Sequence, residues 1–244
     1  MTVHVATVHH RDGRFVDLQL DALERWMSEP FVTWTILDGV ESDRFTTVIP
    51  SPKATTHGPR LDALAHTIFR EADDDDVILF LDGDAWPVSD PCPAIREALA
   101  STGMVAVRRD EALAGPWPHP SFCATTVENW HQLEASWAPT LVPDVEARNR
   151  KDVGGDVLLA LREHGRDFTP LLRVNTHNPH RLFFALYGNT TGPIVYHHGA
   201  GFRPMRCLTD KTLDNQRANE RLSDNILQQA RQNPDFWRRF YETT

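Results

Sequence analysis

The segment 77–88, VILFLDGDAWPV, is a continuous apolar run that ends abruptly in two carboxylates. Residues 77–81 show no alternation of polar and apolar side chains, which is typical of a strand buried on both faces of a mostly parallel sheet. Asp82 and Asp84 follow at its carboxyl end. Residues i and i+2 of an extended chain project to the same side, and ligands of open α/β sheets bind beyond the carboxyl ends of strands. Two oxygen ligands there indicate a divalent cation that holds phosphates.

The same three residues, Asp-Gly-Asp, also have a purely structural interpretation. Aspartate caps its own backbone and glycine readily adopts a positive φ, so this tripeptide is ordinary turn chemistry after a strand. A motif this short matches by chance too often to decide between the two interpretations. The rest of the chain has to supply the context.

Strand-like and helix-like segments alternate along the first part of the chain. Strands are predicted at residues 3–8, 31–37 and 77–81, with helices at 15–27 and 60–72 between them. This order predicts an α/β fold with a mostly parallel central sheet and helices on both faces. A length of 244 residues fits a single domain. Residues 205–244 are expected to form a helical extension that packs on the domain of residues 1–204.

The second part of the chain has less regular signals. Helices are predicted at 91–100, 156–165 and 213–241, the last interrupted at Pro234, and strands at 104–107, 122–127 and 194–196. The proline-rich segment 110–122 is expected to be irregular, as a binding loop or lid. Its Trp117 could stack on a sugar face or serve as a packing anchor. The four aspartates of 73–76 are expected to form a solvated connector.

Composition and charge exclude several classes of protein. The net charge of −9 argues against binding to nucleic acid or to anionic lipid, which require basic surface. Three widely spaced cysteines without a C-x-x-C pair indicate reduced thiols rather than disulfides or a zinc site. Neither a signal peptide nor a transmembrane segment is recognised, so a cytoplasmic enzyme is expected. A homodimer is compatible with the sequence.

Two further segments carry candidate site residues. The segment 197–204, HHGAGFRP, offers an imidazole ligand, a backbone able to approach a phosphate, and the cation of Arg203. A pair of structural histidines and a surface Arg203 are the alternatives. Asp156 follows two glycines at a predicted helix start, where it is either an N-cap or a residue of the site.

The order of these motifs resembles the GT-A fold nucleotide-sugar glycosyltransferases. It is most similar to the family that includes glycogenin and bacterial lipopolysaccharide galactosyltransferases. That family carries D-x-D, then a D-Q-D-like segment opening a helix, then H-x-x-G-x-x-K-P. The resemblance covers roughly residues 3–204. Here the middle motif is G-G-D, and the last, H-x-x-G-x-R-P from His198, is one residue shorter with arginine in place of lysine.

The resemblance implies a metal-dependent enzyme that moves a hexose from a nucleoside-diphosphate sugar to a carbohydrate or small-molecule acceptor with retention of configuration. The implied cation is Mn²⁺ or Mg²⁺, and oxygen ligands with an imidazole favour Mn²⁺. Asp84 would ligate the metal directly, and Asp82 would contact metal and ribose. His198 would be the distal metal ligand, with His197 as the competing choice, and Arg203 would bind the diphosphate.

Other assignments follow position rather than motif. Asp38, at the end of the second predicted strand, would contact the nucleotide, and Arg60 and Asp62 would line the donor sugar. Asp156 would position the sugar, or act as general base if the enzyme inverts configuration. A sugar-1-phosphate nucleotidyltransferase and a non-catalytic sugar-nucleotide-binding protein are the alternative functions. The former would need a glycine-rich basic loop after the first strand, where HHRDGRF offers one glycine.

Overall fold

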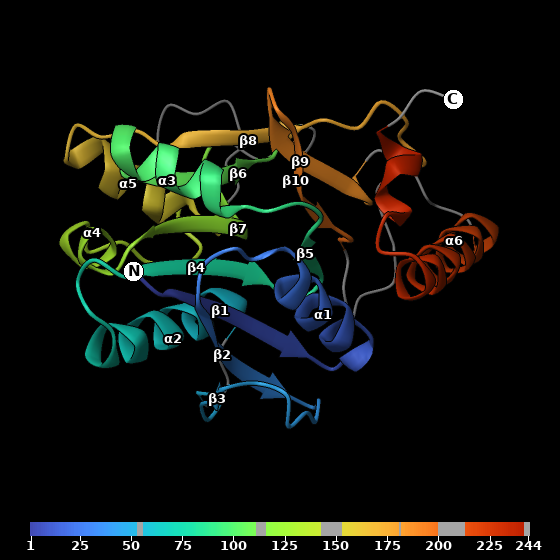
Figure 1. The fold of residues 1–244 in the computed structure, drawn as a ribbon, viewed down its shortest axis with the longest axis horizontal. Coiled ribbons are helices and arrows are strands. Elements are labelled where there is room, and N and C mark those ends of the chain that lie inside the picture. The colour runs from blue at the N-terminus through green and yellow to red at the C-terminus, as the bar shows by residue number, and fades with distance from the viewer. Residues whose placement is uncertain (53–55, 111–115, 143–152, 181, 200–212, 242–244) are drawn as a thin grey trace.

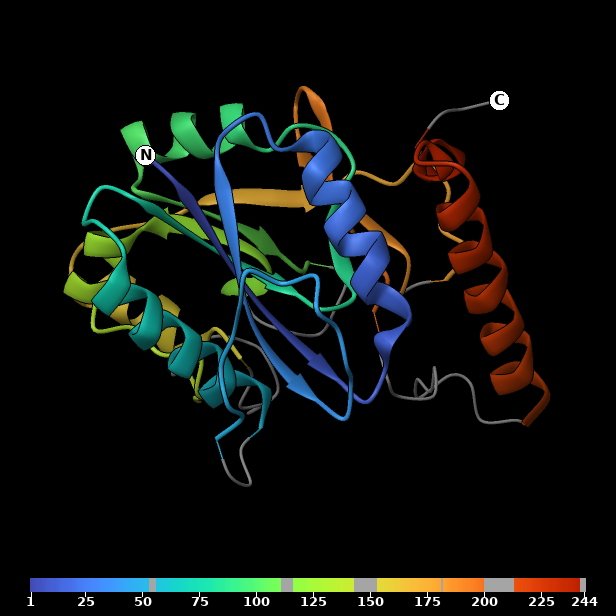
Figure 2. The same ribbon diagram turned by 60° about the horizontal axis from the view of Figure 1, so that its bottom comes forward.

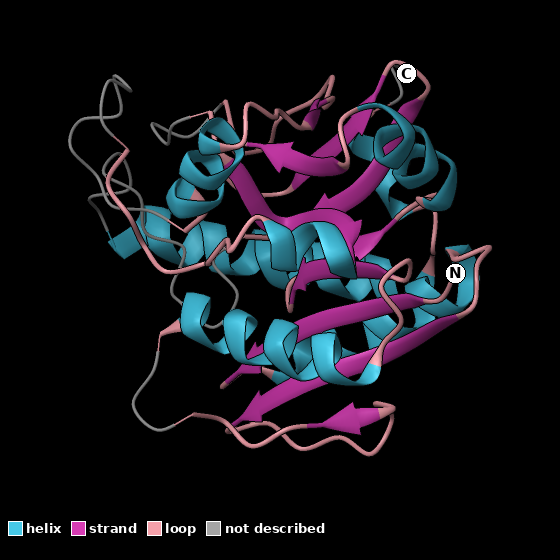
Figure 3. Ribbon diagram, turned by 90° about the vertical axis from the view of Figure 1, so that its left-hand side faces the viewer, coloured by secondary structure: helices cyan, strands magenta, loops and turns pink. Residues whose placement is uncertain are grey.

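The computed structural model describes residues 1–52, 56–110, 116–142, 153–180, 182–199 and 213–241. In this part of the chain ten strands form one sheet in the order β3-β2-β1-β4-β7-β6-β8-β9-β10-β5. Helices cover both of its faces (Figure 1, Figure 3). The predicted α/β class is confirmed.

The first part of the chain alternates strand and helix as its pattern predicts. Its elements are β1 (Val3–His10), α1 (Val16–Trp26), β2 (Phe31–Asp38), β3 (Thr47–Val48), α2 (His57–Glu71) and β4 (Val77–Asp82), with a short 3-10 turn, η1 (Gly13–Phe15), before α1. The pairs β1·β2, β1·β4 and β2·β3 are all parallel. Their carboxyl ends therefore lie along one edge of the sheet.

The second part of the chain completes the sheet with mostly antiparallel pairs. Its elements are β5 (Ala85–Pro87), α3 (Cys92–Ser101), β6 (Met104–Arg108), β7 (Pro118–Thr126), α4 (Val127–Gln132), α5 (Gly155–Glu163), β8 (Thr169–Arg173), β9 (Ala185–Asn189), β10 (Gly192–His197), α6 (Leu213–Gln232) and η2 (Phe236–Phe240). The pair β6·β8 is parallel, and β4·β7, β6·β7, β8·β9, β9·β10 and β10·β5 are antiparallel. Parallel pairing is thus concentrated in the block β3-β2-β1-β4.

The core has two layers because neighbouring residues of a buried strand face opposite sides of the sheet. Val77 and Leu79 of β4 pack with the cluster that contains α1 and α3. Ile78 and Phe80 pack with the cluster that contains α2, α4 and α5. Burying one such side chain stabilises the fold by about 1.5–3 kcal/mol. An all-apolar β4 is therefore required by helices on both faces.

Helix α6 and η2 pack against the antiparallel pair β5·β10 and against α1 (Figure 2). Ile226 of α6 and Phe240 of η2 are fully buried beside Trp86 and Tyr196. The helix α6 ends two residues before Pro234, as the predicted break requires. None of the helices in the described part of the chain is long and apolar enough to cross a membrane.

The expectation that residues 110–122 are irregular is wrong for the part from Pro118 onward, which belongs to β7. The register with β6 shifts between Ala106 and Val107, so Pro120 lies in a bulge where no ladder hydrogen bond is required. Pro118 is the first residue of the strand. Residues 111–115 lie outside the described residues.

The aspartate run divides into two kinds of residue. Residues 73–75 are exposed, as a solvated connector should be, but Asp76 is buried. Its carboxylate accepts a hydrogen bond from the Thr2 backbone and pairs with His4 of β1. The expectation of a wholly solvated connector is therefore wrong at Asp76.

Candidate metal centre

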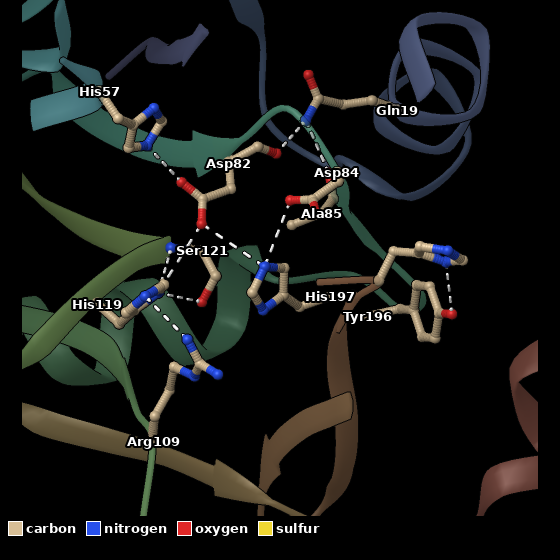
Figure 4. Close-up of polar contacts among 11 residues, drawn as sticks. Gln19, His57, Asp82, Asp84, Ala85, Arg109, His119, Ser121, Tyr196 and His197 are labelled. Atoms are coloured by element: carbon tan, nitrogen blue, oxygen red, sulfur yellow. Dashed lines mark hydrogen bonds and ion pairs between the residues drawn. The ribbon is translucent and has the colours of Figure 1, made fainter. Parts of the chain in front are cut away.

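Two aspartates and a histidine converge where β4 ends (Figure 4). Strand β4 delivers Asp82, and Asp84 follows after a one-residue turn. His197 enters from β10, whose pairing with β5 sets it opposite Ala85. One ligand atom from each of the three side chains lies within 4.8 Å of the others. Two carboxylate oxygens and an imidazole nitrogen are a donor set that fits Mn²⁺.

The three side chains are close and nearly buried. His197 Nε2 lies 3.3 Å from Asp84 Oδ1 and 3.7 Å from Asp82 Oδ2. The side chains of Asp82, Asp84 and His197 are 12%, 13% and 8% exposed. His57, the first residue of α2, donates from Nε2 to Asp82 Oδ1 at 2.8 Å. This bond engages one oxygen of Asp82 and leaves the other directed toward His197.

Electrostatics keep both carboxylates ionised and ready to bind a cation. Burial by itself raises the pKa of Asp82, but the hydrogen bond and charge of His57 outweigh it and hold that pKa well below the usual range. For Asp84, burial likewise opposes ionisation, and the charge of the His197 imidazole outweighs it and lowers the pKa. The His57 and His197 imidazoles thus favour the ionised form of the two carboxylates.

His198 does not join this cluster, which corrects the expectation that it, rather than His197, would accompany the carboxylates. Its Nε2 is 2.7 Å from Ser223 Oγ on α6, and its Nδ1 is 3.1 Å from the Tyr196 hydroxyl. Burial lowers the pKa of His198 to about 3, so it is neutral. Both ring nitrogens are engaged inside the protein, and neither is available to a metal.

His119 of β7 is a further neighbour of the site that the sequence motifs did not single out. Its Nδ1 lies 3.9 Å from Asp82 Oδ2, and its ring centroid lies 5.8 Å from that of His197. Nδ1 accepts the backbone N–H of Ser121 at 3.1 Å, so this nitrogen is unprotonated and already bonded. Burial, followed by the charge of Arg109, holds the pKa of His119 well below its usual range. His119 is therefore a neutral side chain that borders the site.

Asp38 is predicted to contact the nucleotide, and Arg60 to line the donor sugar. The structure places them together, with Asp38 as the last residue of β2 and Arg60 in the first turn of α2. Asp38 accepts from His10 Nδ1 at 2.6 Å and pairs with the Arg60 guanidinium. The hydrogen bond from His10, followed by Arg60, lowers the pKa of Asp38. The strand ends of β1 and β2 thus present an ionised carboxylate that remains one-third exposed.

Asp62 and Asp156 lie together, but both hold a loop rather than stand free. Asp62 accepts from Ser136 Oγ at 2.8 Å and from the Trp137 backbone at 2.7 Å. Asp156 Oδ2 accepts from the Ser136 backbone at 3.0 Å. Burial raises the pKa of Asp62, and the nearby charge of Asp156 adds to this. Gly154, with φ of +95°, occupies the N-cap position of α5, so the N-cap interpretation of Asp156 is wrong.

Two other predictions concern residues at the margins of the site. Trp117 is 2% exposed and packs against Val142 and Leu158, so the packing-anchor interpretation is correct and sugar stacking is wrong. Arg203 lies outside the described residues.

The comparison with known proteins gives matches only among solved structures. No family model and no curated protein matches the chain. A mannosyltransferase from Pyrobaculum calidifontis, solved with GDP-Man and Mn²⁺, is 16% identical, with a TM-score of 0.48 over 72% of this chain and 58% of that one. The galactosyltransferase LgtC, solved with donor and acceptor sugar analogues, is 11% identical, with a TM-score of 0.46 over 92% and 96%. TarS of S. aureus is 9% identical, with a TM-score of 0.49 over 93% and 40%.

The identity of the chain to each of these solved structures is low. The chain spans 58% of the mannosyltransferase and 40% of TarS. The chemistry of the candidate site is therefore derived from the residues of this chain alone.

Sequence reasoning missed His57 and His119, and the reason is physical. His57 begins a helix that was predicted to start three residues later, and His119 lies in a strand that was predicted to be a loop. His119 reaches the carboxylates because β7 lies beside β4 in the sheet, and His57 reaches them because α2 packs on the face formed by β1 and β4. The one available signal was the position of His57, which lies just before a predicted helix in a chain that also carries a D-x-D motif.

Proposed function

We propose that this protein is a divalent-metal-dependent glycosyltransferase that moves a hexose from a nucleoside-diphosphate sugar to a carbohydrate or small-molecule acceptor. The observation that carries the proposal is the convergence of Asp82, Asp84 and His197 at the carboxyl edge of a parallel block of strands. Ligands of α/β sheets bind at this edge, and carboxylates held ionised there suit a cation that carries phosphates.

In this proposal Asp84 and His197 hold the cation, and Asp82 completes the set through the oxygen that His57 does not engage. A bound Mn²⁺ or Mg²⁺ would supply positive charge to the departing diphosphate. The mixed oxygen and nitrogen donors favour Mn²⁺. The His119 side chain, 12% exposed, borders the carboxylates on this side, and a low-dielectric surrounding strengthens their electrostatic interaction with a cation.

The nucleoside is proposed to bind over the ends of β1 and β2. Asp38 is ionised, partly exposed and fixed by His10 and Arg60, so it is suited to accept hydrogen bonds from nucleoside hydroxyls. Arg203 is proposed as the cation that binds the diphosphate, from its place in the H-x-x-G-x-R-P motif.

Asp62 and Asp156 are proposed to act near the donor sugar rather than as metal ligands. Asp62 and Asp156 bind the loop at Ser136 and Trp137, and through it they would shape the sugar pocket. A positioning role for Asp156 agrees with a retaining enzyme, whereas a general base would give inversion. Proton NMR of the product linkage distinguishes the two, since an inverted anomeric centre would contradict retention.

The working compartment is proposed to be the cytoplasm. Cys92 and Cys123 are both buried and free. Burial raises the pKa of the Cys123 thiol, which keeps it protonated and inert to oxidation. Thiols kept in this state agree with a reducing environment.

The proposal is tested by thermal unfolding with panels of nucleoside-diphosphate sugars, with and without Mn²⁺. A ligand that binds only the folded state raises the unfolding midpoint. We expect a stabilising sugar nucleotide that requires Mn²⁺, and transfer of its sugar to an acceptor. Asp84→Asn should lose both effects, and Asp75→Asn, an exposed aspartate of the connector, should retain both. Stabilisation by sugar-1-phosphates with nucleoside triphosphates instead would indicate the nucleotidyltransferase.

A further inference from the structure

Gln19 is a buried polar residue on a helix face that otherwise packs against the sheet. It lies in α1 and is 0% exposed, and the neighbouring Leu20 and Leu23 belong to the hydrophobic core. A buried amide is costly unless its donors and acceptor are satisfied. The partners of Gln19 therefore show what this residue is for.

Both hydrogens of the Gln19 amide go to the turn that carries the candidate metal ligands (Figure 4). Nε2 donates to the carbonyl of Asp82 at 2.8 Å and to the carbonyl of Ala85 at 2.7 Å. A carbonyl can only accept, so the orientation of the amide group is determined by these two partners. One side chain thus bridges the residues before and after the Gly83–Asp84 segment.

The remaining atom of the amide is also held. Oε1 lies 3.2 Å from His9 Nε2, and because Oε1 can only accept, His9 must carry its proton on Nε2. His9 is 2% exposed and contacts the ring of Phe45, so its own position is fixed by packing. Gln19 is therefore oriented by β1 at one end and binds the turn at the other.

The turn has no room to move toward β1. A Cβ atom on Gly83 would lie 2.4 Å from the Val8 carbonyl and 3.0 Å from His9 Nδ1. On its other side, the Asp84 carbonyl accepts the backbone N–H of His198 at 2.9 Å. Side-chain bonds from Gln19 of α1 and a backbone bond from His198, directly after β10, thus hold the turn from two sides.

We propose that Gln19, oriented by His9, is a positioning residue that fixes the Asp82–Ala85 turn so that both carboxylates and His197 stay within reach of one cation. This inference rests on the proposed metal-dependent function. A residue that only satisfied its own buried amide would contribute to stability alone. A positioning residue also sets metal affinity, because partners behind the ligands typically change it 10- to 100-fold.

The test measures binding of Mn²⁺ alone by electron paramagnetic resonance of the free ion, together with urea unfolding of each variant. Gln19→Met removes all three hydrogen bonds at similar volume, and Gln19→Glu keeps the shape and the bond from His9. The control is Leu20→Ala, which creates a cavity one residue away in the same helix and removes no hydrogen bond to the turn.

We expect each Gln19 variant to raise the Kd for Mn²⁺ about tenfold or more while folded, and to broaden the spectrum of the bound ion. Leu20→Ala should be destabilised, yet keep its Kd within about twofold of the unmodified protein. Gln19 variants that lose stability but keep the original Kd would overturn the positioning role. Absence of Mn²⁺ binding by the unmodified protein would contradict the proposed function itself, so the two failures are distinguishable.

Discussion

Two adjacent histidines at the end of β10 differ completely in environment because successive residues of a strand face opposite sides. His197 faces Asp82 and Asp84, and His198 faces α6 and the ring of Phe15. Which of the two adjacent histidines faces the carboxylates therefore decides which is the candidate ligand and which is a packing residue.

The first prediction separates these two roles by substitution. His197→Ala should weaken Mn²⁺ binding at least tenfold and change stability little, because it removes one ligand from a preformed site. His198→Ala should lower the free energy of unfolding by about 1–3 kcal/mol, because it leaves buried polar partners unsatisfied. Urea unfolding and Mn²⁺ titration of both variants check this. Loss of Mn²⁺ binding in folded His198→Ala alone would contradict it.

The D-x-D pair could be predicted from sequence because the signal is local: an apolar run, then alternate carboxylates. The choice between His197 and His198 could not, because the motif resemblance depends on spacing while the strand's register depends on its pairing with β5 and β9. Asp62 and Asp156 have the same limitation, since their shared partner Ser136 is distant in sequence from both.

At the scale of elements, the turn after β4 needs a glycine for lack of space. Gly83 lacks room for a Cβ atom because the Val8 carbonyl of β1 would lie 2.4 Å from it. Gly13 offers a matched comparison, since a Cβ atom there would meet only Val40 at 3.4 Å. A Cβ atom therefore has room at Gly13 but not at Gly83.

The second prediction follows from this difference. Gly83→Ala should destabilise the protein by about 1–3 kcal/mol, as overpacking of a tight contact does, and should also weaken Mn²⁺ binding. Gly13→Ala should change the free energy of unfolding by less than about 1 kcal/mol. Thermal and urea unfolding check both values. Equal stability of the two variants would contradict the close approach of β4 to β1.

Asp76, one residue before β4, forms hydrogen bonds at the amino-terminal edge of the sheet. Trp34 of β2 donates to His4 Nδ1 at 3.0 Å, and His4 Nε2 then donates to Asp76 Oδ2 at 3.2 Å. Burial opposes ionisation of Asp76, but the Thr2 backbone N–H and His4 outweigh it and lower its pKa. These two hydrogen bonds therefore link β2 to β1 through His4, and β1 to the residue before β4 through Asp76.

The third prediction is a dependence of stability on pH. Because its pKa is lowered on folding, Asp76 contributes stability that is present above the unfolded value of about 3.9 and lost as pH falls through the folded pKa. Asp76→Asn should therefore cost about 1–3 kcal/mol at pH 7 and less near pH 3. Urea unfolding at both pH values checks this. An equal cost at both would show that the charge is unimportant.

Elements with strong periodicity were predictable, and those that depend on neighbours were not. β1, β2, β4 and α1 lie within a few residues of their predicted ranges because their apolar patterns are long. β8 and β9 were missed because neither has a long apolar run: β8 carries a proline and an exposed leucine, and β9 ends in Gly188 and Asn189. Such strands form because a neighbouring strand supplies hydrogen bonds, which no local pattern records.

At the scale of the whole molecule, the chain end and the candidate metal centre share one structural unit. The antiparallel pair β5·β10 presents His197 on one side and packs Trp86 and Tyr196 against α6 and η2 on the other. Ser223 of α6 also binds His198, the neighbour of the candidate ligand. Helix α6 and η2 therefore form one packed unit with the pair β5·β10, which carries the third residue of the candidate centre.

The last prediction tests whether the molecule unfolds as one unit. Ile226 is 0% exposed inside the cluster that joins α6 to the pair β5·β10 and to α1. Ile226→Ala should lower the free energy of unfolding by about 2–5 kcal/mol through the cavity it leaves. Because the cluster links both parts, tryptophan fluorescence and far-UV circular dichroism should report one coincident transition at lower urea.

The control for this prediction is Val48→Ala on the edge strand β3, where the side chain is 49% exposed. It should shift the transition by no more than about 0.5 kcal/mol, because little apolar area is lost from the core. A separate early transition in Ile226→Ala, with the rest of the protein unchanged, would contradict a single unit. The shared aromatic cluster predicts instead that loosening α6 loosens β10, and that Mn²⁺, by binding His197, raises the midpoint of the whole transition.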